Sequence, residues 1–208
     1  MQEEVVVRVT TAQDADQVVE LIYSSAPEMF DYMFKAHGKT AQDFIRYEFQ
    51  QGGGFIGHRI HKVAVHGDTI KGIGAFYTGA QHGLLNIQTA WHVLKFYGLW
   101  SGVKTLIRAS HSGSVMLKPK KSEIYIADLG VAEHSRSQGI GSVLIDYHKA
   151  EAKQRGMSHL ALDVATINPR AEALYARLGF EVTGELMFKG GSGAENVPGA
   201  RRMIYSVE

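Results

Sequence analysis

The chain has 208 residues, of which 45% are hydrophobic and 21% are charged. These proportions are typical of a folded domain and exclude disorder for most of the chain, and the length favours one domain over two. The formal net charge of +1 lacks the basic excess that nucleic-acid binders use, and the absence of cysteine excludes disulfides, thiolate metal sites and cysteine nucleophiles.

The start of the chain lacks the basic stretch and apolar run of a secretory signal, and the most apolar long window, 84–107, is interrupted by polar side chains. We therefore expect a cytoplasmic protein with no nucleic-acid or membrane partner. The ten histidines show no spacing typical of a metal site, so we also expect no metal.

The first part of the chain predicts a strand, two helices and a hairpin. β-Branched residues favour strands, capping residues before an apolar stripe favour helices, and Gly67 suits a tight turn. The expected order is a strand at 5–9, a helix ending near 22, a helix at 41–49, and strands at 61–65 and 70–77.

The second part opens with a long segment, 79–121, whose apolar spacing predicts an insertion of one or two helices. The elements expected after it are a strand at 123–131, a helix at 139–155, a strand at 160–165, a helix at 168–177, and strands at 180–188 and 202–207. Residues 190–199 are rich in glycine and predict a flexible loop between the last two strands. Because hairpins alternate with βαβ crossovers, the sequence predicts an α/β (α+β) fold with a mixed sheet covered by helices.

Residues 136–142 carry the clearest functional signal. They lead from a strand directly into an apolar-periodic helix and contain Gly139 and Gly141. Free backbone amides at such a helix start form an anion site that suits a pyrophosphate, although the same pattern is typical of an ordinary tight turn. A Rossmann fingerprint would need glycine or alanine where Leu144 stands, and no P-loop sequence is present.

A second informative segment starts at Asn168. Asn168 can cap a helix and Pro169 suits its first position, so a structural role accounts for both. It does not account for Tyr175, which lies two turns into this helix and shortly before a new strand.

Together these residues resemble the GNAT superfamily of acetyl-CoA-dependent N-acetyltransferases. The resemblance rests on Arg136-x-x-Gly139-x-Gly141 after a strand ending Leu129-Gly130-Val131, and on Asn168, Tyr175 and Gly179-Phe180 further on. It is specific over 123–180. It implies a single domain, 1–208, with a mixed, mostly antiparallel central sheet flanked by helices and a helical insertion, 79–121, before the fourth strand.

The resemblance also implies where acetyl-CoA binds as co-substrate. Backbone amides of the turn headed by Arg136 would bind the pyrophosphate, and Asn168 would contact the pantetheine or adenosine part. The strand Leu129-Gly130-Val131 would pair with the pantetheine arm, with the Val131 amide toward the thioester carbonyl. The amides in question are those of Ser137, Gln138, Gly139, Ile140, Gly141 and Ser142. Independently, Gly130 inside a strand indicates a bulge or a close backbone approach.

Two requirements of the implied reaction need side chains. The acceptor amine, with an ordinary pKa near 10, must lose a proton, and the departing thiolate must be stabilised. The resemblance makes Tyr175 the candidate acid and Asp128 the candidate amine anchor or base, as in polyamine and diamine acetyltransferases. Tyr125, which we expect to contact the acceptor, stands where many members place Glu, and Glu123 is expected to be an exposed residue at the strand start.

The favoured function is transfer of an acetyl group from acetyl-CoA to a primary amine of a small molecule or peptide, by direct attack in a ternary complex. A non-catalytic acyl-CoA-binding module is the alternative, and Tyr175 favours the enzyme. A third interpretation takes 84–108, with its three basic residues and no acid, as a surface that lies on a membrane. We favour instead a lid or dimer-facing helix with ordinary core residues, and a homodimer is compatible with the sequence.

Overall fold

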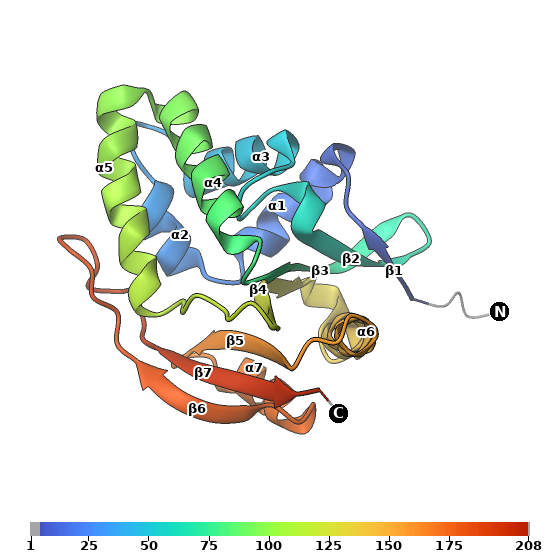
Figure 1. Cartoon of the computed structure of the whole chain (residues 1–208). Coiled ribbons are helices and arrows are strands. Elements are labelled where there is room, and N and C mark those ends of the chain that lie inside the picture. The colour runs from blue at the N-terminus through green and yellow to red at the C-terminus, as the bar shows by residue number, and fades with distance from the viewer. Residues whose placement is uncertain (1–4, 208) are drawn as a thin grey trace.

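The computed structural model describes residues 5–207, which form a seven-stranded sheet with helices on both of its faces (Figure 1). The strands are β1 (Val6–Val9), β2 (His61–His66), β3 (Thr69–Thr78), β4 (Glu123–Val131), β5 (His159–Ala165), β6 (Glu181–Leu186) and β7 (Ala200–Ser206). The helices are α1 (Ala15–Tyr23), α2 (Pro27–Phe34), α3 (Ala41–Gln51), α4 (His82–Tyr97), α5 (Leu99–Ser110), α6 (Ile140–Gln154) and α7 (Pro169–Arg177).

The sheet has the order β1-β2-β3-β4-β5-β7-β6. Of the described strands, only β4 and β5 pair in parallel, and every other neighbouring pair is antiparallel. The predicted mixed, mostly antiparallel sheet is therefore confirmed.

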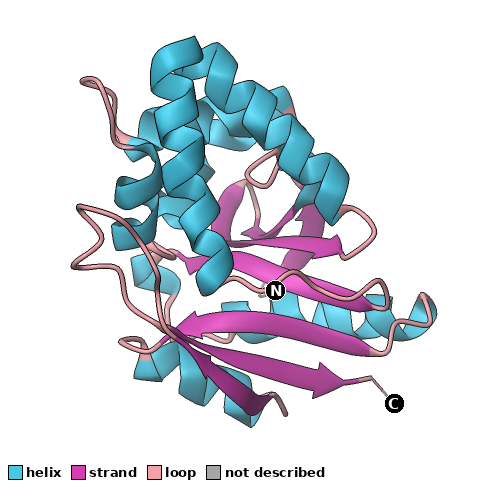
Figure 2. Cartoon of the chain, turned by 60° about the vertical axis from the view of Figure 1, so that its left-hand side comes forward, coloured by secondary structure: helices cyan, strands magenta, loops and turns pink. Residues whose placement is uncertain are grey.

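The helices form two layers, with α1 to α5 on one face of the sheet and α6 and α7 on the other (Figure 2). Successive side chains of a strand point to opposite faces. Accordingly, Ile73 of β3 belongs to the core beneath α1, α2 and α3, whereas Phe76 packs with Leu144 and Ile145 of α6.

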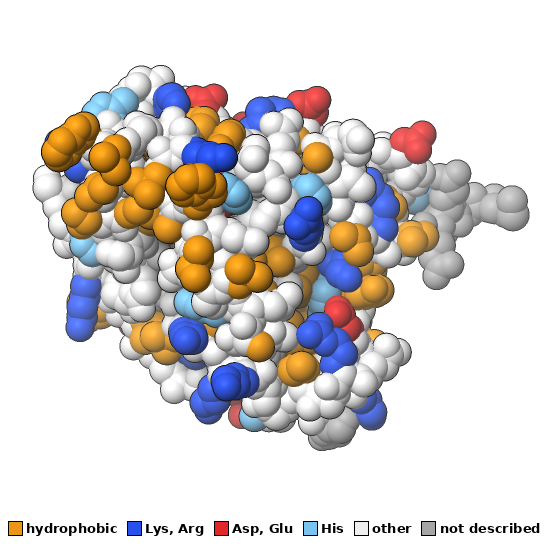
Figure 3. All heavy atoms as spheres, turned by 45° about the horizontal axis from the view of Figure 1, so that its top comes forward, with side chains coloured by type: hydrophobic (Ala, Val, Ile, Leu, Met, Phe, Trp, Pro, Cys, Tyr) orange, Lys and Arg blue, Asp and Glu red, His pale blue; other side chains and the backbone are white. Residues whose placement is uncertain are grey.

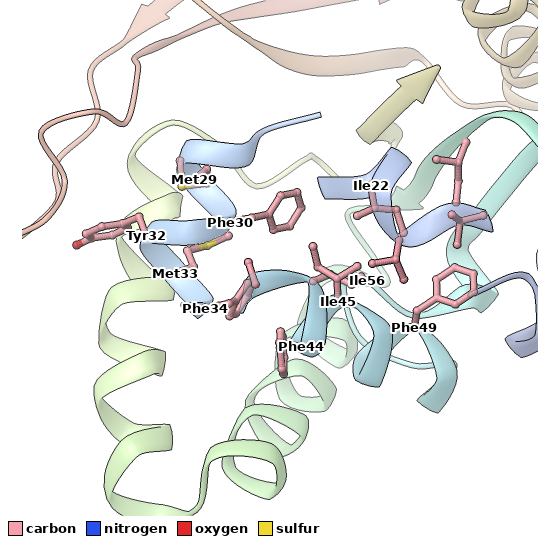
Figure 4. Close-up of a cluster of buried hydrophobic side chains, with 14 of the residues drawn as sticks. Ile22, Met29, Phe30, Tyr32, Met33, Phe34, Phe44, Ile45, Phe49 and Ile56 are labelled. Atoms are coloured by element: carbon pink, nitrogen blue, oxygen red, sulfur yellow. The ribbon is translucent and has the colours of Figure 1, made fainter. Parts of the chain in front are cut away.

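The larger core lies among α1, α2 and α3 and is rich in aromatic side chains (Figure 4). The rings of Phe34 and Phe44 are 4.4 Å apart and tie α2 to α3. Helix α2 itself was not predicted, because it is short and nearly every position after its first turn is apolar, which hides the helical period. Its buried residues are Met29, Phe30, Tyr32, Met33 and Phe34.

Local signals located most of the other elements within a few residues. Gly67 adopts a φ of +57° in the predicted β2–β3 turn. Asn168 caps α7 as predicted, since its side-chain oxygen accepts a hydrogen bond of 3.1 Å from the Ala171 amide.

The two helices expected in the insertion are present as α4 and α5, but most of the apolar positions that indicated them are not core residues, whereas Leu106 packs against the larger core. Leu84, Ile87, Trp91, Leu99 and Val103 are all exposed. Apolar side chains gather over this part of the surface in Figure 3. The periodicity showed correctly that these residues share a face, but that face points away from the sheet. Within residues 5–207, no helix combines the length and the apolar character needed to span a membrane.

Candidate active site

Strands β4 and β5 separate halfway along their length. They pair over Glu123–Ile126 and His159–Leu162 only, and beyond those residues β4 continues to Val131 and β5 to Ala165 without further pairing between them. On its other edge β4 stays paired with β3 as far as Val131. One edge of the second half of β4 is therefore open to a ligand that can pair with an extended backbone.

The Val131 amide points toward this open edge. The next amide, that of Ala132, donates to the Lys71 carbonyl of β3 at 2.9 Å. Because neighbouring amides of a strand point to opposite edges, the Val131 amide faces away from β3. The Val131 carbonyl lies on the same side, where it accepts a hydrogen bond of 3.4 Å from Nε of Arg136.

The second half of β4 begins with a bulge. The β3–β4 register shifts between Ile73 and Ala75, and opposite this shift Asp128 has a φ of +50°, which is strained for a residue with a side chain. The close approach predicted at Gly130 is confirmed, because a Cβ atom there would lie 2.2 Å from the Leu21 carbonyl oxygen of α1. Helix α1 thus packs directly on the backbone of β4.

The turn between β4 and α6 presents a group of unpaired amides. Within residues 5–207, the amides of 137–142 donate to no backbone carbonyl, and the first helical bond runs from Val143 to the Gly139 carbonyl. Gly139 precedes the helix with a φ of +82°, and Ser137 has a φ of +64°. Donors converging at a helix start attract an anion, so the turn has the character that the sequence predicted.

Helix α7 supports this turn from the side. Arg170 donates a hydrogen bond of 2.8 Å to the Ser137 hydroxyl, and a Cβ atom at Gly141 would lie 3.1 Å from the Leu174 side chain. A larger residue at 141 would therefore push α6 and α7 apart.

Tyr175 lies on the next position of α7 and is buried against Phe180, with 5.9 Å between the two rings. Burial raises the pKa of its hydroxyl, so Tyr175 stays protonated at every physiological pH. Asn168, at the start of the same helix, uses its side-chain oxygen as the cap.

On the face covered by α1 to α5, the first half of β4 carries a buried charge network. The Tyr125 hydroxyl donates to Oδ2 of Asp163 at 2.7 Å, and Arg202 lies 3.0 Å from Asp163 and 3.5 Å from Glu123. Burial raises the pKa of Tyr125 well above its ordinary value, and the charge of Asp163 adds to the shift. The expectation that Glu123 is exposed is wrong, since the residue is 2% exposed and Arg202 neutralises it.

Asp128 lies on the same face and has a partner that the sequence did not indicate. Its Oδ2 is 3.8 Å from Nε2 of His61, the first residue of β2. Asp128 is partly exposed, whereas His61 is fully buried.

The family model of the GNAT acetyltransferases matches residues 29–180. The chain belongs to this family. The resemblance found in the sequence is therefore confirmed.

Two curated relatives of this GNAT chain match over short stretches. The streptothricin acetyltransferase of Streptomyces lavendulae is 41% identical over 59 residues, which cover 28% of this chain and 31% of that protein. The 5-NmdU N-acetyltransferase of Pseudomonas phage PaMx11 is 37% identical over 76 residues, which cover 36% of this chain and 51% of that protein. The matched stretches thus span about a third to half of those relatives.

Solved GNAT structures share the whole fold at low identity. An N-acetyltransferase from Staphylococcus aureus Mu50 superposes with a TM-score of 0.72 at 18% identity, covering 96% of this chain and 100% of that structure. This agreement concerns the fold alone.

Two of the cavities in the described part of this GNAT protein lie away from the open strand edge. One, of about 340 Å³, lies between α2, α5 and the β6–β7 loop, and Glu28, Asp31, Tyr32 and Arg108 are among its lining residues. The other, of about 130 Å³, lies near the start of β2 and the second half of α6, with Arg59, Phe76 and His148 in its wall. Neither of these two cavities is lined by the 136–142 turn or by Asp128.

Sequence reasoning missed two residues of this GNAT site, His61 and Arg170. The sequence analysis considered the histidines only as metal ligands, and within residues 5–207 no group of three potential metal ligands lies together. Arg170 lies in the first turn of α7, within the family motif that starts at Asn168. That position could have indicated that Arg170 lies beside the 136–142 turn.

Proposed function

We propose that this enzyme transfers an acetyl group from acetyl-CoA to a primary amine of a small molecule or peptide, by direct attack within a ternary complex. The observation that carries the proposal is the pairing of an open edge on β4 with the unpaired amides of 137–142. Acetyl-CoA supplies the acetyl group as an activated thioester. The free amides of 137–142 can donate to its pyrophosphate, and the open edge of β4 can pair with its amide-containing arm.

The residues of the site divide this work. In the proposal, the amides of 137–142 and Arg136 hold the pyrophosphate, and Arg170 keeps Ser137 in its strained conformation. Leu129, Gly130 and Val131 pair with the arm along the open edge of β4. Asn168 still has its side-chain NH₂ group to contact the same arm, because the cap uses only its oxygen.

The acceptor side is proposed to lie on the face of Asp128. A primary amine is protonated at neutral pH, so a carboxylate attracts it and must also help to remove one proton. Tyr175 carries a proton for the departing sulfur. Tyr125 is proposed as part of the wall behind the acceptor, since its hydroxyl is bonded to Asp163.

The names of the two curated relatives support an acetyltransferase and refer to different acceptors, streptothricin and 5-NmdU. They do not select one for this chain. A screen of amines with acetyl-CoA, with released thiol as the readout, would identify the acceptor, and the absence of cysteine keeps that readout free of background.

Binding of acetyl-CoA is tested by thermal unfolding. A ligand at about 100 times its Kd stabilises the native state by about 2.7 kcal/mol, which raises the melting temperature by several degrees for a chain of this size. Gly139→Leu should abolish this shift. Gly156→Leu is the matched control, because Gly156 follows the other end of α6, also has a positive φ and also has open space around it.

Both variants should lose similar stability without ligand, and only Gly139→Leu should lose the response to acetyl-CoA. No shift of the wild-type protein at millimolar acetyl-CoA would refute the proposed co-substrate. The cytoplasmic location, the homodimer and the lack of a membrane partner stay predictions, and light scattering and sedimentation with anionic liposomes test the last two.

A further inference from the structure

His61 is held in a defined protonation pattern. Its Nδ1 lies 2.9 Å from the Gly57 carbonyl oxygen, and its ring packs against Phe49 at 5.8 Å. A carbonyl oxygen only accepts hydrogen bonds, so Nδ1 must carry the hydrogen. In the neutral ring, Nε2 is then an unprotonated acceptor.

This bare nitrogen faces a carboxylate. Nε2 of His61 is buried, lies 3.8 Å from Oδ2 of Asp128, and has no hydrogen-bond partner within residues 5–207. Two acceptors facing each other leave both without a donor, which is unfavourable for buried groups unless a proton comes between them. The arrangement is therefore ready to receive a proton.

The backbone keeps Asp128 in this position at a cost. Its φ of +50° is a conformation that residues with a side chain rarely adopt, although Asp and Asn tolerate it better than most. Such strain persists where the surroundings require it and is concentrated at functional sites. The bulge directs Asp128 to the face that carries His61, at the point where β4 leaves β5.

We infer that Asp128 and His61 together accept the proton that the acceptor ammonium must lose. The inference deepens the proposed function and rests on it. Asp128, which is partly exposed, contacts the ammonium as the catalytic residue and takes one proton from it. His61 receives that proton on Nε2 through Asp128 and acts as a positioning residue that returns Asp128 to its charged form.

The balance of the step is complete without another reactant. The ammonium gives one proton to the pair, and its nitrogen forms a bond to the acetyl carbonyl carbon while the carbon–sulfur bond breaks. The sulfur leaves as a thiolate and takes up a proton from Tyr175, and the reacting nitrogen gives its second proton to the Tyr175 oxygen, which restores the hydroxyl. One proton is released overall, and His61 returns it to solvent through Asp128.

Among the described residues, the other titratable groups around His61 do not share the proton-accepting role of Asp128. Tyr77 of β3 lies near Asp128, and burial together with the charge of Asp128 raises the pKa of its hydroxyl, so it remains neutral. The remaining groups on the neighbouring elements have other partners or positions: His58 bonds to the Phe49 carbonyl, Arg8 pairs with Asp14, Glu48 pairs with His92, and Arg59 lines the smaller cavity.

His58 provides a closely matched control. It lies on the short turn before β2, its Nδ1 is 2.9 Å from the Phe49 carbonyl oxygen, and its ring packs against Phe49 at 5.9 Å and the same angle as that of His61. The two histidines differ in that only His61 faces a carboxylate and in that His58 is partly exposed whereas His61 is fully buried.

The kinetic test compares wild type, His61→Gln and His58→Gln with the acceptor found in the amine screen. The acid limb of kcat/KM against pH reports the base of the free enzyme. We expect His61→Gln to lose this limb and to lower kcat about 10²- to 10⁴-fold. His58→Gln should keep both the limb and most of the turnover. A His61→Gln enzyme with the wild-type limb overturns the inference.

A second measurement needs no activity and no substitution of His61. In ¹⁵N spectra of labelled protein, the neutral His61 ring should carry hydrogen on Nδ1 and leave Nε2 unprotonated, because Nδ1 donates to the Gly57 carbonyl oxygen. A neutral ring protonated on Nε2 alone overturns the inference.

The two proposals fail in different ways. If acetyl-CoA leaves the melting temperature unchanged, the proposed function fails. If acetyl-CoA binds and amines are acetylated while His61→Gln keeps the wild-type pH profile, the function stands and only the role of His61 and Asp128 is rejected.

Discussion

The two halves of β4 belong to one strand but meet different surroundings. In residues 124–126 both edges are paired with neighbouring strands, and the carboxylates of Glu123 and of Asp163 on β5 share the guanidinium of Arg202. In residues 127–131 one edge is open, and Asp128 combines a strained backbone with an unpaired neighbour in His61.

The difference shows that the first half of β4 supports the fold, whereas the second half carries the proposed chemistry. Buried carboxylates are tolerated in the first half because Arg202 lies beside both of them, whereas the second half leaves one strand edge open to a ligand. Substitutions in the first half should therefore change stability, and substitutions around the second half should change turnover.

The largest effect is expected at Arg202. Arg202→Met leaves Asp163 buried without a cation and Glu123 with only the exposed Lys120, and breaking a buried ion pair in this way costs about 3–5 kcal/mol. Denaturant unfolding measures the loss. Arg201→Met is the control. The guanidinium of Arg201, the preceding residue in β7, pairs with Glu172 and Glu185 at the surface, so its loss should lower the stability much less. Equal losses for both variants would remove the distinction drawn for the first half.

A smaller effect is expected at Tyr175, and on turnover instead of stability. Tyr175→Phe should lower kcat about 10²-fold with little change in the affinity for acetyl-CoA, since general acid catalysis contributes at least this much and the ring remains. Tyr205→Phe is the control, because the ring of Tyr205 also packs against Phe180, at 5.6 Å. Unchanged turnover under conditions where chemistry limits the rate would reject the acid role.

The smallest change in stability is expected at Asp128. Asn adopts a positive φ readily, so Asp128→Asn should change the free energy of unfolding by no more than about 0.5 kcal/mol while weakening acceptor use. Asp128→Val should cost about 1–2 kcal/mol, because a β-branched residue does not tolerate that conformation. Titration calorimetry with acetyl-CoA should give the same Kd for wild type and Asp128→Asn. Equal losses of acetyl-CoA binding and acceptor use would indicate a structural role for the carboxylate.

The sequence by itself determined the features that depend on residues close together in the chain. The anion-binding turn requires only a strand, Gly139 and the first turn of a helix, and the cap of α7 requires only Asn168 and the next three residues. Such signals are local because each donor and its acceptor lie within one turn of the backbone.

Only the tertiary structure decided which distant groups meet. The apolar period of α4 and α5 marked one face of each helix, but the packing placed Leu84 and Trp91 outside the core. The burial of Glu123 against Arg202 and the approach of His61 to Asp128 follow from strand order and from the bulge in β4, which bring together residues far apart in the sequence. Periodicity records which side chains share a face, whereas the partner that covers the face is chosen by the register and packing of the whole sheet.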